Sequence, residues 1–118
     1  MQSVLDAKVV DQLRALARDG SPGLLDRLQA VYARDTPDRL RALRTAVAAG
    51  DDDAVAFSVH TLKGSAANLG ATRVVEALRD IESSAPGTSA ALLEPLLAAL
   101  ERHAADAQAE LTLLARSG

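Results

Sequence analysis

The chain has 118 residues, of which 25 are alanine and 19 are leucine, whereas only two, Tyr32 and Phe57, are aromatic. This length suits one domain with a substantial hydrophobic core and is too short for two. Alanine and leucine favour helices, and the scarcity of aromatic and β-branched residues disfavours a sheet. The absence of cysteine excludes a disulfide framework, a thiolate metal site and a cysteine nucleophile. Composition therefore predicts a small, soluble, all-α domain.

The chain carries 13 basic and 16 acidic side chains, a net charge of −3. This balance lacks the basic surface typical of nucleic-acid-binding proteins, and two aromatic residues are too few for a base-stacking platform. The apolar runs are far shorter than the roughly 20 residues of a membrane span. The first ten residues also lack the basic start and apolar stretch of a signal peptide. We therefore expect a cytoplasmic protein with no nucleic-acid or membrane partner.

Turn-forming residues divide the chain at four places: residues 20–23, 50–53, 68–70 and 83–89. Between these breaks, apolar residues recur with the spacing of amphipathic helices. The pattern predicts five helices, over about residues 5–18, 23–49, 52–69 and 71–84 and from the last break to about residue 114. Four long helices with short loops pack most simply as an antiparallel four-helix bundle, with the short N-terminal helix as a cap. Residues 1–118 are predicted to form a single domain.

Proline occurs inside two of these predicted helices. The apolar stripe of the second helix stays in phase across Pro37, which favours one long helix bent at Pro37. The alternative is that Thr36 caps a separate helix, with Pro37 at its first position. In the last helix, Pro95 is expected in the first turns or at a bend.

His60 stands out in the third predicted helix because it faces away from the apolar side. On a wheel of about 100° per residue, the apolar residues lie between about 180° and 260° from His60; they are Val55, Val59, Leu62, Ala66 and Leu69. Lys63 lies about 60° to one side of His60 and Gly64 about 40° to the other. The sequence therefore predicts one exposed patch formed by His60, Lys63 and Gly64.

Lys63 and Gly64 are unusual residues for this sequence. Six of the seven glycines occur in breaks or at the C-terminus, whereas Gly64 lies inside a helix, where glycine costs roughly 1 kcal/mol relative to alanine. Close helix packing would explain it, but Gly64 is off the apolar face, which favours access for a partner's backbone. Lys63 is one of two lysines beside eleven arginines. It is either an ordinary surface lysine or an ammonium suited to a phosphoryl group.

Other polar residues have simpler interpretations. His103 continues the apolar stripe of the last helix, which predicts a partly buried structural histidine. Asp51, Asp52 and Asp53 are expected to cap the third helix and complement its dipole rather than bind a metal, so no metal site is predicted. No phosphate-binding glycine loop is present, so we expect neither ATP binding nor self-phosphorylation.

The exposed patch permits a specific chemistry. A neutral imidazole keeps one ring nitrogen unprotonated and nucleophilic, so His60 can attack a phosphorus atom in line and become a phosphohistidine. Lys63 would stabilise the added charge, and catalysis would consist mainly of positioning and electrostatics.

The segment His60–Ala71, HTLKGSAANLGA, resembles the signature of the histidine phosphotransfer (HPt) domains of bacterial phosphorelays, and looser similarity extends over about residues 21–114. The resemblance implies a four-helix bundle. It also implies that His60 accepts a phosphoryl group from a receiver-domain aspartate, or from a kinase, and passes it to another receiver. Lys63 and Gly64 would support the phosphoryl group and keep access open.

The resemblance also implies the partners: response-regulator receiver domains and a sensor histidine kinase, with this chain a monomer. No cofactor is expected on the chain, because Mg²⁺ would belong to the receiver. Phe57 departs from the family pattern, which often has a polar residue there, and either anchors a receiver helix or folds against a neighbouring helix. Thr61 and Ala67 are further docking candidates. The alternative function is a non-catalytic helical adaptor or dimerisation module.

Overall fold

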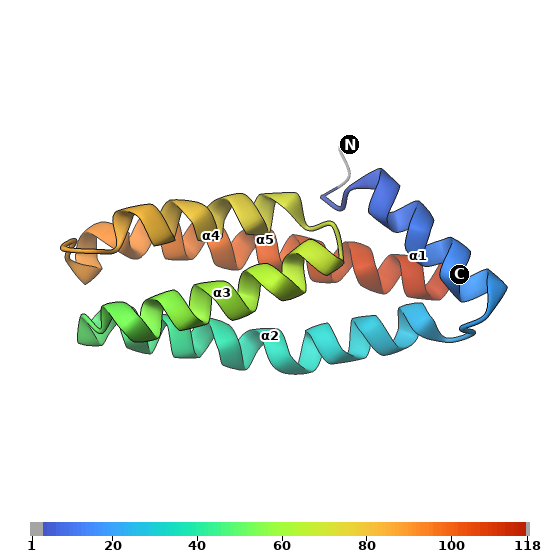
Figure 1. Ribbon diagram of the computed structural model, residues 1–118, viewed down its shortest axis with the longest axis horizontal. Helices are drawn as coiled ribbons and strands as arrows, with labels where there is room; N and C mark the ends of the chain where they lie inside the picture. The colour runs from blue at the N-terminus through green and yellow to red at the C-terminus, as the bar shows by residue number, and fades with distance from the viewer. Residues whose placement is uncertain (1–3, 118) are drawn as a thin grey trace.

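The computed structural model describes residues 4–117 and contains five α-helices joined by short loops (Figure 1). They are α1 (Ala7–Asp19), α2 (Leu24–Ala49), α3 (Asp52–Asn68), α4 (Thr72–Ser84) and α5 (Ala90–Ser117). No strand occurs within this described range, and none of its helices is long and apolar enough to cross a membrane. The predicted all-α fold class is therefore confirmed.

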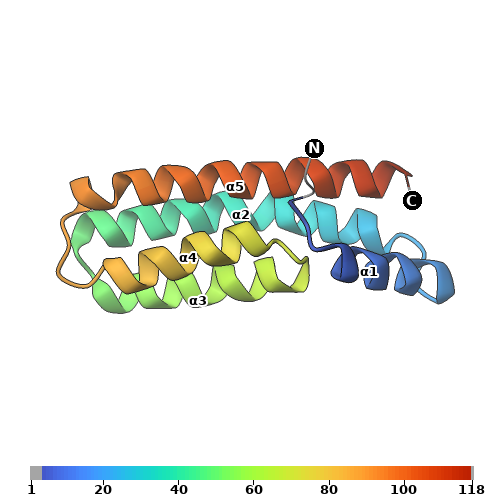
Figure 2. The same ribbon diagram turned by 90° about the horizontal axis from the view of Figure 1, so that it is seen from above.

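Helices α2 to α5 form an antiparallel four-helix bundle in which α3 and α5 occupy diagonal corners. Both α2 and α4 pack against α3 and against α5, an arrangement that Figure 2 shows from above. The helices differ in length, because α2 has 26 residues and α5 has 28, whereas α3 has 17 and α4 has 13. As a result α2 and α5 extend beyond α3 and α4, and α1 lies beside this projecting part and packs against α2, as expected for an N-terminal cap.

Each helix of the bundle contributes at least one fully buried side chain to the core. Leu43 in α2, Val59 in α3, Leu78 in α4 and Leu100 in α5 are each 0 % exposed. Burial of an aliphatic side chain of this size contributes roughly 1.5–3 kcal/mol, so the direction in which each helix faces is strongly determined. Val59 and Leu62 both point into the core from positions about 260° and 200° around the helix from His60, so His60 points away from it.

The segment before α1 is attached to the bundle at the turn between α3 and α4. Leu5 is buried at 2 % exposure, and its amide donates a hydrogen bond to the Glu110 carboxylate of α5, 3.0 Å away. The amide of Asp6 donates to the carbonyl of Gly70 at 2.7 Å. Gly70 has a φ of 71°, and a Cβ at this position would lie 2.8 Å from the Cβ of Val9. Glycine is therefore required here both for the turn and for the close approach of the N-terminal segment.

α2 continues through Pro37, so the prediction of one long helix is confirmed and the alternative of two helices is wrong. Proline removes one helical hydrogen bond, but tertiary contacts hold the preceding turn. Tyr32 and Thr36 are buried there, and the Tyr32 hydroxyl donates to the carbonyl of Ala104 in α5 at 3.3 Å. Burial raises the pKa of Tyr32 to about 12, because the phenolate would lose its hydration. Pro95 lies inside α5, close to its start, and is exposed.

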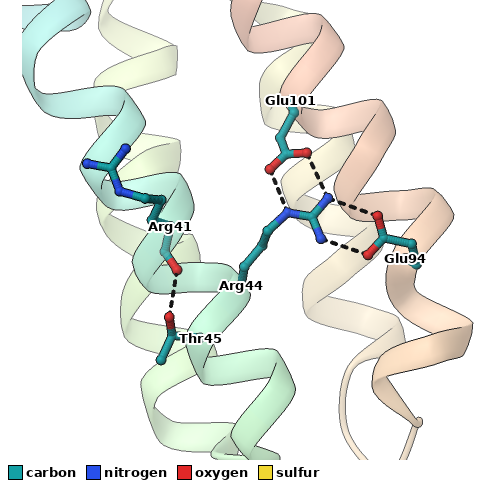
Figure 3. A network of polar contacts seen from close by, with 5 residues as sticks. All are labelled: Arg41, Arg44, Thr45, Glu94 and Glu101. Carbon is teal, nitrogen blue, oxygen red and sulfur yellow. Dashed lines mark hydrogen bonds and ion pairs between the residues drawn. The ribbon is translucent and has the colours of Figure 1, made fainter.

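A second contact between α2 and α5 is an ion-pair network at Arg44 (Figure 3). The guanidinium donates two hydrogen bonds to Glu101, both at 2.7 Å, and two to Glu94, at 2.7 and 2.9 Å. These hydrogen bonds lower the pKa of both carboxyl groups and raise that of Arg44. The three side chains remain partly exposed, so solvent screens the network and its contribution to stability is modest.

We expect Arg44→Met to lower the free energy of unfolding near neutral pH and to have less effect at about pH 3. Both glutamates have a lowered pKa in the folded state, so their stabilisation is present above the unfolded pKa and is lost as the pH falls through the folded pKa. Urea denaturation followed by circular dichroism at the two pH values measures the difference. Arg41→Met is the control, because Arg41 pairs with Asp38 within α2. An equal loss for Arg44→Met at both pH values would contradict the prediction.

Candidate functional site

The helix that carries the predicted patch, α3, starts with an acidic cap. The carboxylate of Asp51 accepts a hydrogen bond from the amide of Ala54 at 3.1 Å, and Asp52 and Asp53 follow in the first turn, where they complement the helix dipole. The predicted capping role of these aspartates is confirmed. Over residues 4–117, no group of three or more histidine, cysteine or acidic residues is arranged to hold a metal ion.

His60 lies on the outer face of α3 with its side chain exposed. Val59 and Leu62, which flank it in sequence, are buried at 0 % and 3 % exposure, so the helical period turns His60 outward. Within the described part of the chain, no hydrogen bond or ion pair engages its imidazole. The ring nitrogens of His60 are therefore open to a group brought by another molecule.

Lys63 lies one turn beyond His60 and forms an ion pair with α4. Its ammonium donates a hydrogen bond to the carboxylate of Glu82, with a distance of 3.2 Å between Nζ and Oε1. The side chain of Lys63 is 27 % exposed and that of Glu82 is 47 % exposed. Sequence reasoning did not identify Glu82 as a site residue. The helical pattern of α4 does not reveal the pairing, because it depends on how α3 and α4 are aligned in the bundle.

Gly64 is exposed on the same face of α3, beside His60. A Cβ built on Gly64 would meet no atom within 4 Å outside its own helix backbone. The alternative explanation for this glycine, close packing between helices, is therefore wrong. The structure leaves open space at the position where any other residue would place a side chain next to His60.

The three docking candidates differ in how they lie on α3. Phe57 is 73 % exposed, so the alternative that it folds against a neighbouring helix is wrong. Thr61 is half-buried, and its hydroxyl donates to the carbonyl of Phe57 one turn earlier at 3.0 Å. Ala67 is exposed and lines a shallow hollow shared with Thr72 and Arg79. Phe57 and Ala67 thus present accessible surface on either side of His60, whereas Thr61 is partly covered.

His103 lies on α5, diagonally across the bundle from α3, so the two histidines do not form one site. It is half-buried beside Ala77 and Leu96, and its Nδ1 atom is buried without a hydrogen-bond partner among residues 4–117. This placement agrees with the interpretation of His103 as a structural residue between helices.

The site therefore combines an exposed imidazole, a nearby cation and open approach. His60 and Gly64 are exposed on the outer face of α3, so a group presented by a partner that covers α3 can reach them. Such an arrangement suits transfer of an anionic group between macromolecules better than turnover of a small molecule, which requires a concave pocket.

Comparison with known proteins agrees with this geometry. The family model for the Hpt domain matches residues 27–114. Among solved structures, the chain is similar to histidine-containing phosphotransfer protein B (HptB) from Pseudomonas aeruginosa PAO1, with 28% sequence identity and a TM-score of 0.77. The match covers 100% of this chain and 99% of that chain. A comparison with curated protein sequences finds no match.

We expect Gly64→Ala to raise the free energy of unfolding by about 1 kcal/mol, because alanine is the better helix former and the added Cβ meets no neighbour. Gly70→Ala is the matched control and should destabilise the fold, since Gly70 has a positive φ and its Cβ would clash with Val9. Urea denaturation of both variants measures the changes. A loss of stability in Gly64→Ala would show that this glycine serves the fold after all.

Proposed function

The chain belongs to the Hpt domain family, whose members carry phosphoryl groups in phosphorelays, and on this premise we propose that His60 is the residue that becomes phosphorylated. The observation that carries the proposal is the outward position of His60 on α3, with Lys63 one turn away and open space at Gly64. The half-buried His103 offers no comparable access.

The proposed reaction is a direct transfer between a receiver aspartate and His60. The unprotonated ring nitrogen of His60 attacks the phosphorus of the aspartyl phosphate, and a nitrogen–phosphorus bond forms as the phosphorus–oxygen bond breaks. The electron pair of the broken bond stays on the aspartate carboxylate. The reverse reaction delivers the phosphoryl group to another receiver. No base is needed, because the attacking nitrogen carries no proton in the correct tautomer.

Lys63 and Gly64 are proposed to support this transfer in different ways. The ammonium of Lys63 is a compact cation that can meet the phosphoryl oxygens as a charged donor. Gly64 lets the partner's backbone approach the phosphorus without a side chain in between, which favours the in-line geometry that phosphoryl transfer requires.

Hpt domains work with receiver domains and kinases in phosphorelays. For this chain we propose a sensor histidine kinase and response-regulator receivers as partners, in the cytoplasm, with the chain acting as a monomer. Its role would be that of a carrier that binds no ATP. The Mg²⁺ used in the transfer would be held by the receiver, and no cofactor by this chain.

We further propose that Phe57 anchors the receiver. A large aromatic side chain that is 73 % exposed loses its contact with water when a partner covers it, and such residues often dominate the energy of an interface. Ala67 and the accessible part of Thr61 would lie within the same covered area. The interface would then extend along α3 on both sides of His60.

We expect His60→Gln to abolish phosphorylation of the chain and His103→Gln to leave it unchanged, because only His60 presents an exposed imidazole. Each variant is incubated with phosphoramidate, a small donor that phosphorylates histidine, and phosphohistidine is measured by ³¹P NMR. Adding an isolated receiver domain with Mg²⁺ should then remove the label from the chain. Undiminished labelling of His60→Gln would refute the assignment, and a label that no receiver accepts would favour the adaptor function.

We expect Phe57→Ala to weaken receiver binding by on the order of tenfold, the loss typical of a truncated aromatic anchor. Leu92→Ala is the matched control, because Leu92 is 72 % exposed but lies on α5, diagonally opposite α3. Calorimetric titration with a receiver domain that accepts phosphate from the chain gives both dissociation constants. If Phe57→Ala binds as tightly as Leu92→Ala, Phe57 does not contact the receiver.

A further inference from the structure

The cation nearest in sequence to the proposed phosphoryl site, Lys63, is already paired with the carboxylate of Glu82. Glu82 belongs to α4, and its Oε1 lies 3.2 Å from the ammonium of Lys63. Lys63 itself lies on α3, one helical turn from His60. The pair crosses from one helix to the other, so its geometry depends on the packing of α3 against α4. Lys63 is the better covered of the two side chains, at 27 % exposure, and the partial burial reduces solvent screening around it.

A phosphoryl group on His60 would compete with Glu82 for this ammonium. A phosphoryl group carries a charge of about −1.5 to −2 near neutral pH, and Lys63 is the cation one turn away. If Lys63 turns to the phosphoryl group, it gives up part of its interaction with Glu82. The carboxylate also repels the phosphoryl group directly. Both effects have the same sign, because each makes the phosphohistidine less favourable than it would be without Glu82.

We propose that Glu82 is a positioning residue that limits how strongly Lys63 stabilises the phosphohistidine, so that the phosphoryl group remains transferable. The inference rests on the proposed role of His60 and Lys63. A carrier has to accept a group from one partner and give it to the next. An unopposed cation beside His60 would favour acceptance at the expense of release, since it stabilises the intermediate itself. Glu82 offsets part of that stabilisation.

The test is the equilibrium between the chain and phosphoramidate in ammonium buffer. In this reaction a nitrogen–phosphorus bond to His60 forms, the nitrogen–phosphorus bond of phosphoramidate breaks, and ammonia leaves with the electron pair. The equilibrium constant is read from the ³¹P signals of phosphohistidine and phosphoramidate. We expect Glu82→Gln to raise this constant about two- to fivefold, the range for one partly exposed charge pair. No change or a decrease would overturn the proposal.

A double-mutant cycle shows whether Glu82 acts through Lys63. In the Lys63→Ala background, we expect Glu82→Gln to raise the equilibrium constant by no more than half the factor found in the wild-type background, because only direct repulsion is left. An equal or larger factor in that background would mean that Glu82 acts by repulsion alone and would overturn its positioning role. Lys63→Ala by itself should lower the constant.

Asp80→Asn is the matched control, because it removes one negative charge from the same helix on the side that faces α5, near His103. It should leave the equilibrium constant unchanged. An effect equal to that of Glu82→Gln would show that any negative charge on α4 has this effect, and would overturn the proposal.

The His60→Gln variant, which lacks the proposed phosphoryl acceptor, is the blank for these measurements. Signal in that blank would refute the proposed function itself, whereas a clean blank with no response to Glu82→Gln would refute only the inference about Glu82.

Discussion

The burial of one face of α3 is the constraint on which the rest of the site depends. An amphipathic helix at the surface of a bundle buries one side, and α3 uses Val59 and Leu62 to meet the core between α2 and α4. The opposite side is consequently exposed, and His60 and Gly64 lie on it without any dedicated loop or cavity. The apolar contacts that stabilise the bundle therefore also determine where His60, the proposed phosphoryl acceptor, points. If α3 shifted by one residue so that His60 took the place of Val59, the imidazole would be buried and Val59 would move to the half-buried position of Ser58.

Much of this arrangement could be predicted from the sequence, because it depends on local periodicity. The spacing of apolar residues predicted the helices and turned His60 away from the core. The position of Gly64 off that face argued against a packing role, and the open space around it in the structure then ruled that role out. Pro37 was compatible with two interpretations, and the in-phase apolar stripe favoured the continuous helix that the structure shows.

The features that escaped prediction all depend on contacts between distant segments. Glu82 is an ordinary surface glutamate on the wheel of α4, and only the alignment of α4 against α3 brings it to Lys63. The same holds for Arg44, whose two glutamate partners lie on α5, and for the hydrogen bond that ties Leu5 to Glu110. Helix periodicity specifies the direction of a side chain, whereas its partner depends on the relative translation of two helices, which one sequence does not encode in any local pattern.

The exposure of His60 on the outer face of α3, which gives partners access, also has a consequence for the lifetime of the signal if His60 is the phosphorylated residue. Enzymes that close over a reactive intermediate protect it from hydrolysis, but an exposed phosphohistidine on α3 would face bulk water whenever no partner covers it. Hydrolysis by water and transfer to a receiver would then compete for the phosphoryl group on His60. The fraction of signal that reaches the next protein would depend on how soon a receiver arrives, and therefore on the cellular concentration of receivers.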